Sequence, residues 1–244
     1  CSDKTGTLTQ NKMHADKFIT PDSFPGTLPN ALVAQVLGEG HRPHLCFALA
    51  LNNDVLINEG KLEGEPTELA LCQAALDQGF NKLQLESSMP RLAEFAFDST
   101  RKRMTTLHAL EGSAVSYTKG APESVIARCT SHLVNSKPDR ATFKAEQWIT
   151  ASEDLASQGY RVLALAMRHF PDAKAAATDK EALESELTFL GLIALIDPPR
   201  EEAKVAVAQC ITAGITPVMI TGDHPATACA IAEQIGLIET PTHS

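Results

Sequence analysis

The feature that most restricts the fold is a pair of prolines in the run Asp197-Pro198-Pro199-Arg200. Two successive prolines fix the backbone and cannot continue a helix, which is typical of a hinge between two structural units. After them, helical patterns over 201–213 and 225–235 flank an apolar run at 215–220, which predicts a buried strand. Alternation of helix and strand indicates a parallel, doubly wound sheet. Because this stretch holds too few strands for a complete sheet, we expect it to be one end of a Rossmann-like domain.

The sequence before these prolines has a different pattern. Five segments have the alternation or the composition of strands: 92–97, 104–110, 114–118, 161–167 and 187–196. Others have the length or spacing of helices: 31–37, 45–52, 66–78, 144–158 and a short one after Pro122. The helix that begins at Pro66 is the clearest, since proline suits the first helical position and Gly79 ends it. The pattern over 14–196 therefore predicts one α/β (α+β) unit with a mostly antiparallel sheet flanked by helices.

Composition excludes several classes of protein. The chain has 244 residues, 43% of them hydrophobic, which is ample for a buried core. Its 30 acidic and 21 basic residues give a net charge of −9, so we expect no nucleic-acid partner, because phosphate contacts need a basic face. The chain has no stretch of about 18 apolar residues, so the sequence predicts no membrane span. The six cysteines form no CxxC pair and predict reduced, mostly buried thiols, and His41 and His44 lack the further ligands of a metal site.

The run Asp3-Lys4-Thr5-Gly6-Thr7-Leu8-Thr9 carries the sharpest chemical signal. An aspartate at the end of a strand can attack a phosphorus atom and form an acyl phosphate. That step needs positive charge and hydrogen-bond donors around the phosphoryl oxygens. Lys4, the Thr5 hydroxyl and the backbone around Gly6 could supply part of them. Taken alone, the run could also be an ordinary turn in which the aspartate bonds its own backbone.

Four motifs together resemble those of the P-type cation-transporting ATPases, in the order that this family has them. They are DKTGTLT at 3–9, KGAPE at 119–123, DPPR at 197–200 and MITGDH at 219–224. The sequences FDSTRKRM at 97–104 and EGEPTE at 63–68 are similar to those of the branch that includes calcium and sodium/potassium pumps.

The resemblance implies a domain organisation and a role for each motif. Residues 1–13 and 197–244 would form part of a haloacid-dehalogenase-like Rossmannoid phosphorylation domain, and 14–196 the nucleotide-binding domain inserted in it. Asp3 would take the γ-phosphate of ATP, and its carboxylate and the main-chain carbonyl of Thr5 would ligate Mg²⁺. The remaining residues implied to contact the phosphoryl group or the nucleotide here are Lys4, Asp197, Arg200, Thr221, Gly222 and Asp223.

The nucleotide must be held without a glycine-rich phosphate loop, because no Walker or Rossmann motif occurs in the chain. Phe97 offers a flat face for adenine, and such stacking is worth roughly 1–3 kcal/mol. Lys102 and Lys119 supply positive charge, and Glu68 could accept from the adenine amino group. The full set matching the adenosine pocket of the family is Glu68, Phe97, Lys102, Met104, Lys119, Gly120, Ala121, Arg161 and Leu163.

Several of these residues also have a structural interpretation. Phe97, in an alternating strand, would by default belong to the core. The run Arg101-Lys102-Arg103 could be a solvated strand edge that prevents aggregation. Glu68 could favour the first turn of its helix through the helix dipole. Ser99 lies where some relatives carry arginine, so one phosphate contact could be missing.

The resemblance predicts that this chain, which opens on Cys1 rather than Met, is a soluble, cytoplasmic fragment of a multi-pass membrane pump for cations. Its partners would be ATP and the transmembrane and actuator domains of the same pump, and the transported cation would not bind to it. We expect it to bind ATP without sustained turnover. A free-standing phosphatase or phosphotransferase of the dehalogenase superfamily is the alternative, although such enzymes carry a second Asp where this chain has Thr5. A nucleotide-sensing or protein-interaction module is a further one.

Overall fold

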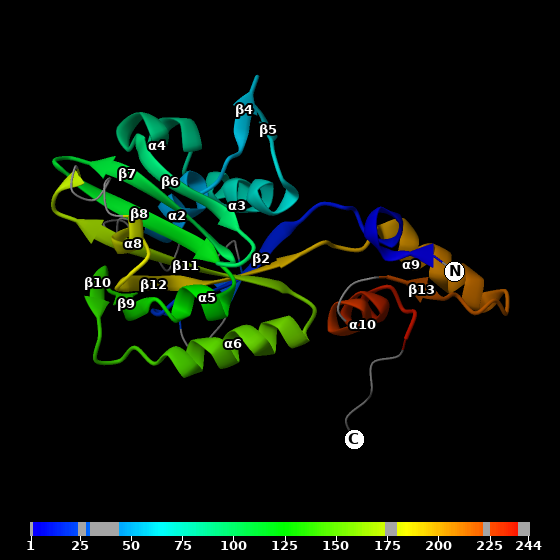
Figure 1. The fold of residues 1–244 in the computed structure, drawn as a ribbon. Helices are drawn as coiled ribbons and strands as arrows, with labels where there is room; N and C mark the ends of the chain where they lie inside the picture. Colours follow the sequence, from blue (N-terminus) through cyan, green and yellow to red (C-terminus); the bar gives the residue numbers. More distant parts are fainter. Residues whose placement is uncertain (1, 24–27, 30–43, 174–179, 222–224, 239–244) are drawn as a thin grey trace.

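The computed structural model describes residues 2–23, 28–29, 44–173, 180–221 and 225–238. The helix predicted at 31–37 lies outside these ranges, as do Cys1, His41, Gly222 and Asp223. Two units are visible in Figure 1, a large one built on a sheet and a small one that carries both ends of the chain, and two extended segments join them. Among the described residues, no helix is both long enough and apolar enough to cross a membrane.

The large unit is built on a sheet of nine strands in which almost all neighbours are antiparallel. Its main path runs β10-β9-β12-β11-β8-β7-β6; off this path, β2 pairs with β12, and β3 pairs with β2. The bounds are β2 His14–Ile19, β3 Leu28–Pro29, β6 Arg91–Asp98, β7 Arg103–Leu110, β8 Ser113–Gly120, β9 Cys129–Val134, β10 Lys137–Asp139, β11 Arg161–Phe170 and β12 Leu187–Ile196. Among the described strands of this sheet, only β12 and β9 are parallel neighbours. The mostly antiparallel sheet expected from the sequence is confirmed.

Helices cover both faces of this sheet (Figure 1). On one face lie α2 (His44–Leu51), α3 (Pro66–Asp77) and α4 (Lys82–Ser88); on the other lie α5 (Pro122–Ile126) and α6 (Ala145–Ser157), with the short α8 (Lys180–Leu183). Strand β11 shows why both faces are buried. Leu165 packs with the α2–α3 side, whereas Ala164 and Ala166 pack with the α5–α6 side, because successive side chains of a strand point to opposite faces.

The helix α3 begins as the sequence predicts. Pro66 occupies its first turn, and the Glu65 side chain accepts a hydrogen bond from the Thr67 amide at 2.8 Å. This satisfies one of the amide groups that a helix start leaves without a partner. The helix α4 was not predicted, although Asn81 caps it in the same way by accepting from the amides of Leu83 and Gln84.

A small hairpin stands apart from the main sheet. It consists of β4 (Leu56–Asn58) and β5 (Lys61–Glu63), which pair only with each other. Its turn uses Glu59 and Gly60 with φ of 49° and 78°, the left-handed values that a two-residue hairpin turn requires. In Figure 1 it projects from the large unit above α3.

The small unit joins the two ends of the described chain. It holds β1 (Ser2–Asp3), a π-helical turn (Lys4–Leu8), α9 (Glu201–Thr212), β13 (Met219–Ile220) and α10 (Pro225–Gln234). The N-terminal segment thus includes a strand and a helical turn. Strands β1 and β13 pair in parallel, with Asp3 opposite Ile220. A small core of Leu8, Ala203, Val207 and Ile235 holds the unit together.

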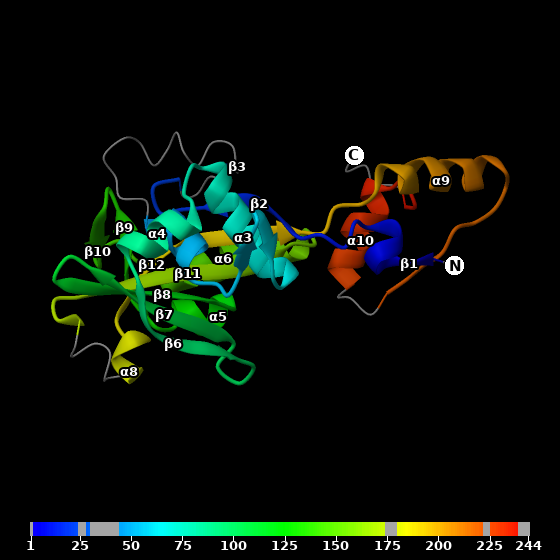
Figure 2. The same cartoon turned by 90° about the horizontal axis from the view of Figure 1, so that it is seen from above.

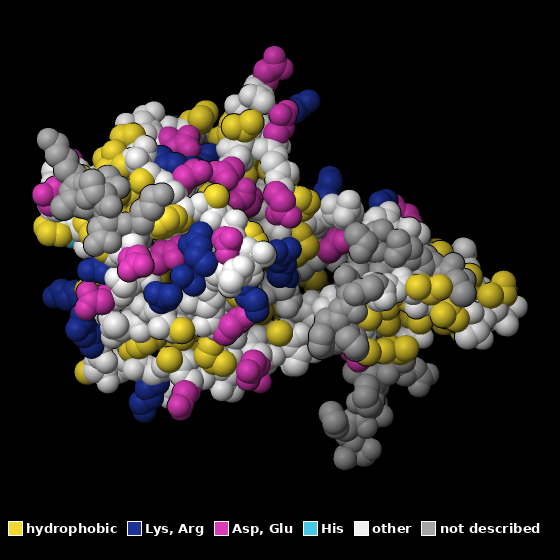
Figure 3. Space-filling view, in the orientation of Figure 1, with side chains coloured by type: hydrophobic (Ala, Val, Ile, Leu, Met, Phe, Trp, Pro, Cys, Tyr) yellow, Lys and Arg dark blue, Asp and Glu magenta, His cyan; other side chains and the backbone are white. Residues whose placement is uncertain are grey.

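The prediction of a buried strand at 215–220 is wrong in two respects. Only Met219 and Ile220 form a strand, and Ile215 and Ile220 are 58% and 59% exposed. The physical reason is that β13 has one hydrogen-bonded neighbour in the described part of the chain. A parallel strand is buried only when further strands and helices cover it. Exposed apolar side chains accordingly gather on the small unit, at the right of Figure 3.

Candidate functional site

Lys119 lies near the end of β8, on the face of the sheet that α2 and α3 cover. Its side chain is 9% exposed, and its ammonium donates to Glu68 Oε1 at 2.6 Å and to the main-chain oxygen of Asn52. Burial lowers the pKa of Lys119, and the Glu68 carboxylate opposes that effect. Met104 on β7 pairs directly with Lys119, so that both side chains lie on this face.

Glu68, at the start of α3, has a more specific structural role than the helix-dipole interpretation gave it. Besides the ion pair with Lys119, its Oε2 accepts from the Asp54 amide at 3.0 Å. Residues 52–54, which follow α2, were missed by sequence reasoning. The buried Asn52 side chain donates to the main-chain oxygen of Tyr117 at 2.7 Å and so links α2 to β8. No motif marked this contact, because it joins segments that are 65 residues apart.

Phe97 does not belong to the core. Its side chain is 64% exposed, so the default interpretation of this residue is wrong. Phe95 pairs with Thr105 and Asp98 with Arg103, so three residues of β6 span two of β7, which defines a bulge. Beyond the bulge the alternation is reset, and Phe97 falls on the face of Met104 and Lys119. The bulge therefore directs an exposed aromatic ring to the side where Lys119 lies.

Lys102 lies in the turn between β6 and β7. Its φ is 53°, a left-handed conformation that is uncommon for a residue with a side chain. The ammonium pairs with Glu123 Oε1 at 3.0 Å, and both side chains are 59% exposed. Gly120 packs against this turn so closely that a Cβ there would overlap the main-chain oxygen of Lys102. The glycine is therefore needed for the approach of two backbones, besides any room it leaves for a ligand.

The remaining residues of the predicted pocket lie around the same end of β8. Ala121 donates its amide to Lys102 O at 2.9 Å. Ala164 of β11 pairs with Gly120, and Leu163 precedes it as a half-buried wall of the α2–α3 core. Arg161, exposed at the start of β11, lies just beyond that pair. The structure thus brings the predicted adenosine residues to one end of the sheet.

The predicted phosphoryl site is described in part. Asp3 ends β1, and Thr221 directly follows β13, the strand paired with β1. The two residues therefore lie at the same edge of a parallel pair, whereas Asp223 falls outside the described residues. Side chains of Asp3, Lys4 and Thr5 are not among those described. In the described part of the chain, no three His, Cys, Asp or Glu side chains form a group that could hold a metal ion.

Asp197 and Arg200, expected to contact ribose and phosphates, make contacts with the N-terminal segment. Asp197 accepts from the Thr9 hydroxyl at 2.6 Å and from the Lys12 amide at 3.1 Å. Arg200 donates to the main-chain oxygens of Thr9 and Gly6, at 2.9 and 3.0 Å. Together with the isolated β-bridge between Thr9 and Pro199, these hydrogen bonds hold the two connecting segments together.

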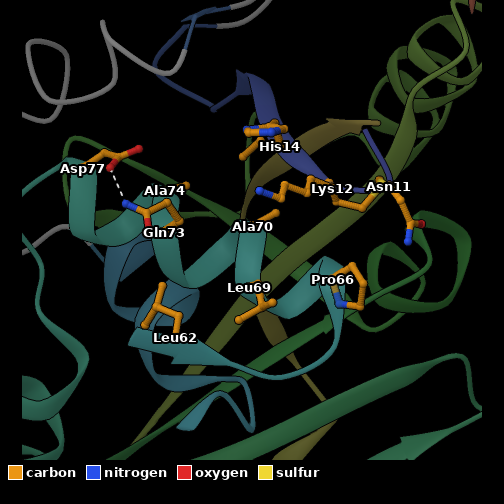
Figure 4. A pocket seen from close by; sticks show the side chains of 12 residues that line it. Asn11, Lys12, His14, Leu62, Pro66, Leu69, Ala70, Gln73, Ala74 and Asp77 are labelled. Carbon is orange, nitrogen blue, oxygen red and sulfur yellow. Dashed lines mark hydrogen bonds between the residues drawn. The ribbon is translucent and has the colours of Figure 1, made fainter. Parts of the chain in front are cut away.

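A cavity of about 290 Å³ lies where one connecting segment meets the large unit (Figure 4). One wall is the segment from Asn11 to Ala15, and the other is α3, from Pro66 to Asp77, with Leu62 of β5 below. Figure 4 shows Lys12 and His14 across from the apolar side chains of Leu69 and Ala70. The cavity therefore lies at the junction between the two units.

Comparisons with known proteins identify the family of the chain. The chain matches the family model described as P-type ATPase, cytoplasmic domain N, over residues 43–202. It is 39% identical over 243 residues to a calcium-transporting ATPase 1 of Bacillus cereus and 40% identical over 240 residues to one of Lactococcus lactis. It is 38% identical over 257 residues to the cation-transporting ATPase pma1 of Synechocystis. These alignments cover 97–98% of the chain but only 26–28% of the relatives, so the chain spans about a quarter of their length.

Proposed function

Because the chain belongs to the P-type ATPases and contains their cytoplasmic N domain, we propose that it is the ATP-binding part of a multi-pass membrane pump for cations. The relatives named for calcium or cation transport support this assignment. On this proposal 14–196 is the nucleotide-binding domain, and 1–13 with 197–244 is part of a dehalogenase-like phosphorylation domain. The partners of the chain are ATP and the membrane-spanning and actuator parts of the same pump.

The observation that carries the proposal is the exposed ring of Phe97 on the same face as the Lys119–Glu68 pair. A large aromatic side chain that is 64% exposed loses the favourable burial of its apolar surface. An adenine stacked on Phe97 restores that burial, while Lys102 and Lys119 offer positive charge to the ribose and phosphates. Met104 and Leu163 provide the apolar walls of the pocket.

Asp3 is the proposed acceptor of the γ-phosphate. It lies at the carboxyl end of a parallel strand pair, where α/β sheets bind ligands, and Thr221 is beside it. The oxygen donors at this edge, the Asp3 carboxylate and the Thr5 main-chain carbonyl, are the type that Mg²⁺ prefers and would hold it there. Mg²⁺ neutralises the charge of the transferring phosphoryl group. Lys4, Thr221 and Asp223 would contact that group.

The two units of the molecule would have to approach each other during the reaction. Figures 1 and 2 both show the small unit, whose strand β1 ends at Asp3, set apart from strands β6, β7 and β8 of the large unit, with the connecting segments between them. ATP bound at Phe97 therefore reaches Asp3 only after closure about those segments. The bonds of Asp197 and Arg200 to the N-terminal segment keep the two connections together, so that they would move as one hinge. We expect the chain by itself to bind ATP without sustained turnover.

A titration of ATP into the full chain tests the proposal. Phe97→Ala should weaken binding by roughly tenfold, because base stacking on an aromatic ring is worth about 1–3 kcal/mol. Leu92→Ala is the matched control, since Leu92 lies on the same strand and is 43% exposed. No binding by the wild-type chain at millimolar ATP would contradict the proposal.

Labelling with [γ-³²P]ATP tests the phosphoryl acceptor and the turnover of the fragment. Acid-stable label on the wild-type chain that is absent from Asp3→Asn would contradict the expectation of an inactive fragment while supporting the role of Asp3. Release of phosphate from a generic aryl phosphate would favour the free-standing phosphatase instead.

A further inference from the structure

Glu184 is a buried carboxylate on the face of the sheet opposite Lys119, and the proposed function gives it no role. It follows α8 and is 5% exposed. Arg101 donates to its Oε1, Arg103 donates to its Oε2 at 2.7 Å, and the Thr105 hydroxyl donates to Oε1 at 2.9 Å. Burial raises the pKa of Glu184, but these hydrogen bonds outweigh it and leave the pKa below the usual value. Glu184 is therefore an anion at neutral pH.

The two arginines bound by Glu184 flank Lys102 on either side. Arg103 is almost completely buried, and its guanidinium also donates to the main-chain oxygen of Arg101 and to Ser124. Arg101 donates further to the main-chain oxygen of Ala96 at 2.8 Å. Both positive charges are thus held on the far face. Of the three basic residues in this run, only Lys102 keeps a mostly exposed side chain, which is 59% accessible.

The main chain of Lys102 is fixed as well. Its amide donates to Asp98 O at 2.6 Å, and its oxygen accepts from the Ala121 amide. A positive φ at a residue with a side chain costs roughly 1–3 kcal/mol and persists only where the surroundings impose it. The contacts of Glu184 with both neighbours of Lys102 are such a constraint, because they fix the strand that begins at Arg103 and the end of the turn before it.

We propose that Glu184 is a positioning residue for nucleotide binding: by holding Arg101 and Arg103 on the far face, it fixes the turn that carries Lys102, whose ammonium would exchange the exposed Glu123 carboxylate for the phosphates of ATP. This inference rests on the proposed function, in which Lys102 meets the phosphates of ATP. It explains why, in a run that resembles a solvated strand edge, Arg101 and Arg103 pair with a buried carboxylate, whereas the ammonium of Lys102 pairs with the exposed Glu123.

The test compares Glu184→Gln with Glu181→Gln, which changes an exposed glutamate of α8 three residues earlier in the chain. Binding of ATP and of adenosine to the full chain is measured for each variant, in the wild-type and the Lys102→Met backgrounds. We expect Glu184→Gln to weaken ATP binding by roughly three- to tenfold and to leave adenosine binding unchanged, because only ATP has phosphates for Lys102. In the Lys102→Met background the same change should have almost no effect, and Glu181→Gln should have none in either.

Folding is checked through the fluorescence of Trp148, the single tryptophan, which is buried in the large unit. If Glu184→Gln does not fold, Arg103→Lys replaces it. That variant keeps the charge but loses the donor to Oε2, and we expect the same loss specific to ATP.

An equal loss for ATP and adenosine, or an equal loss in both backgrounds, would overturn the inference by showing a purely structural role. Wild-type binding that Glu184→Gln leaves unchanged would overturn this inference alone, whereas failure of the wild-type chain to bind ATP would remove the proposed function as well.

Discussion

Two apolar runs that look alike in the sequence have opposite fates in the structure. Residues 187–196 form β12, in which every side chain but that of Ile196 is buried. Residues 215–220 contribute only the two-residue strand β13, and Ile215, Val218 and Ile220 are 48–59% exposed. Strand β12 has strands on both sides and helices on both faces, whereas β13 has a single described neighbour. Apolar composition therefore shows that a segment can be buried, but the number of layers around it decides whether it is.

The largest expected effect is on the core of the large unit. Phe189 of β12 is fully buried, and its ring lies 4.6 Å from that of Trp148. Phe189→Ala should lower the free energy of unfolding by about 3–5 kcal/mol, because it removes apolar contacts and leaves a cavity. Urea denaturation measures this loss. Phe189→Leu should cost much less, and a similar cost for both variants would contradict the tight packing described for β12.

The next largest effect is a loss of stability at acid pH, and it also concerns the large unit. The pKa of His108 is lowered to about 4, first by burial and then by the charges of Arg91 and Lys82, while a hydrogen bond with the Met89 carbonyl opposes the shift. The ordinary pKa of histidine is near 6.5, so between pH 6.5 and 4 the unfolded chain binds a proton that the folded chain does not. Stability should therefore fall by up to about 3 kcal/mol as the pH falls through this window.

Denaturation at a series of pH values measures this dependence in the wild-type chain and in His108→Gln. The variant should lose less stability on acidification than the wild-type chain. If both lose the same amount between pH 6.5 and 4, the buried neutral histidine is not the cause.

A smaller effect is expected at the junction of the two units. Asp197→Ala removes the acceptor of the Thr9 hydroxyl and of the Lys12 amide, and should cost about 1–2 kcal/mol. Hydrogen exchange at the Lys12 amide should become faster, while exchange within β12 should stay as it is. Asp154→Ala, which removes an exposed carboxylate of α6, is the control and should change neither.

The smallest effect is expected on the exposed face of the small unit. Val205 of α9 is 58% exposed, so Val205→Thr should change the free energy of unfolding by no more than about 0.5 kcal/mol. The change keeps the shape of the side chain and replaces one methyl group with a hydroxyl. A loss of more than 1 kcal/mol in urea denaturation would show that this face is buried in solution, which would weaken the contrast between the two units.

Much of the large unit could be predicted because its signals are local. The alternation in β7 and β8, Pro66 at the start of α3 and Gly159 after α6 each follow from neighbouring residues. The strands β2, β3, β4, β5, β9 and β10 and the helices α4 and α8 were missed. Strand β2 is a short segment whose first residues are mostly polar and exposed, and it is recruited to the sheet by pairing with β12, more than 170 residues further along the chain.

The sequence by itself determined which residues can do the chemistry: an aspartate followed by Lys-Thr-Gly-Thr, an aromatic ring, and lysines at fixed positions in ordered motifs. Only the tertiary structure decided how they are presented. The bulge in β6 exposes Phe97, Glu184 binds the two arginines beside Lys102, and Asp197 bonds to Thr9. The physical reason is that motifs report the chemical type of a side chain, whereas burial, strand register and the pairing of charges depend on residues that meet only when the chain folds.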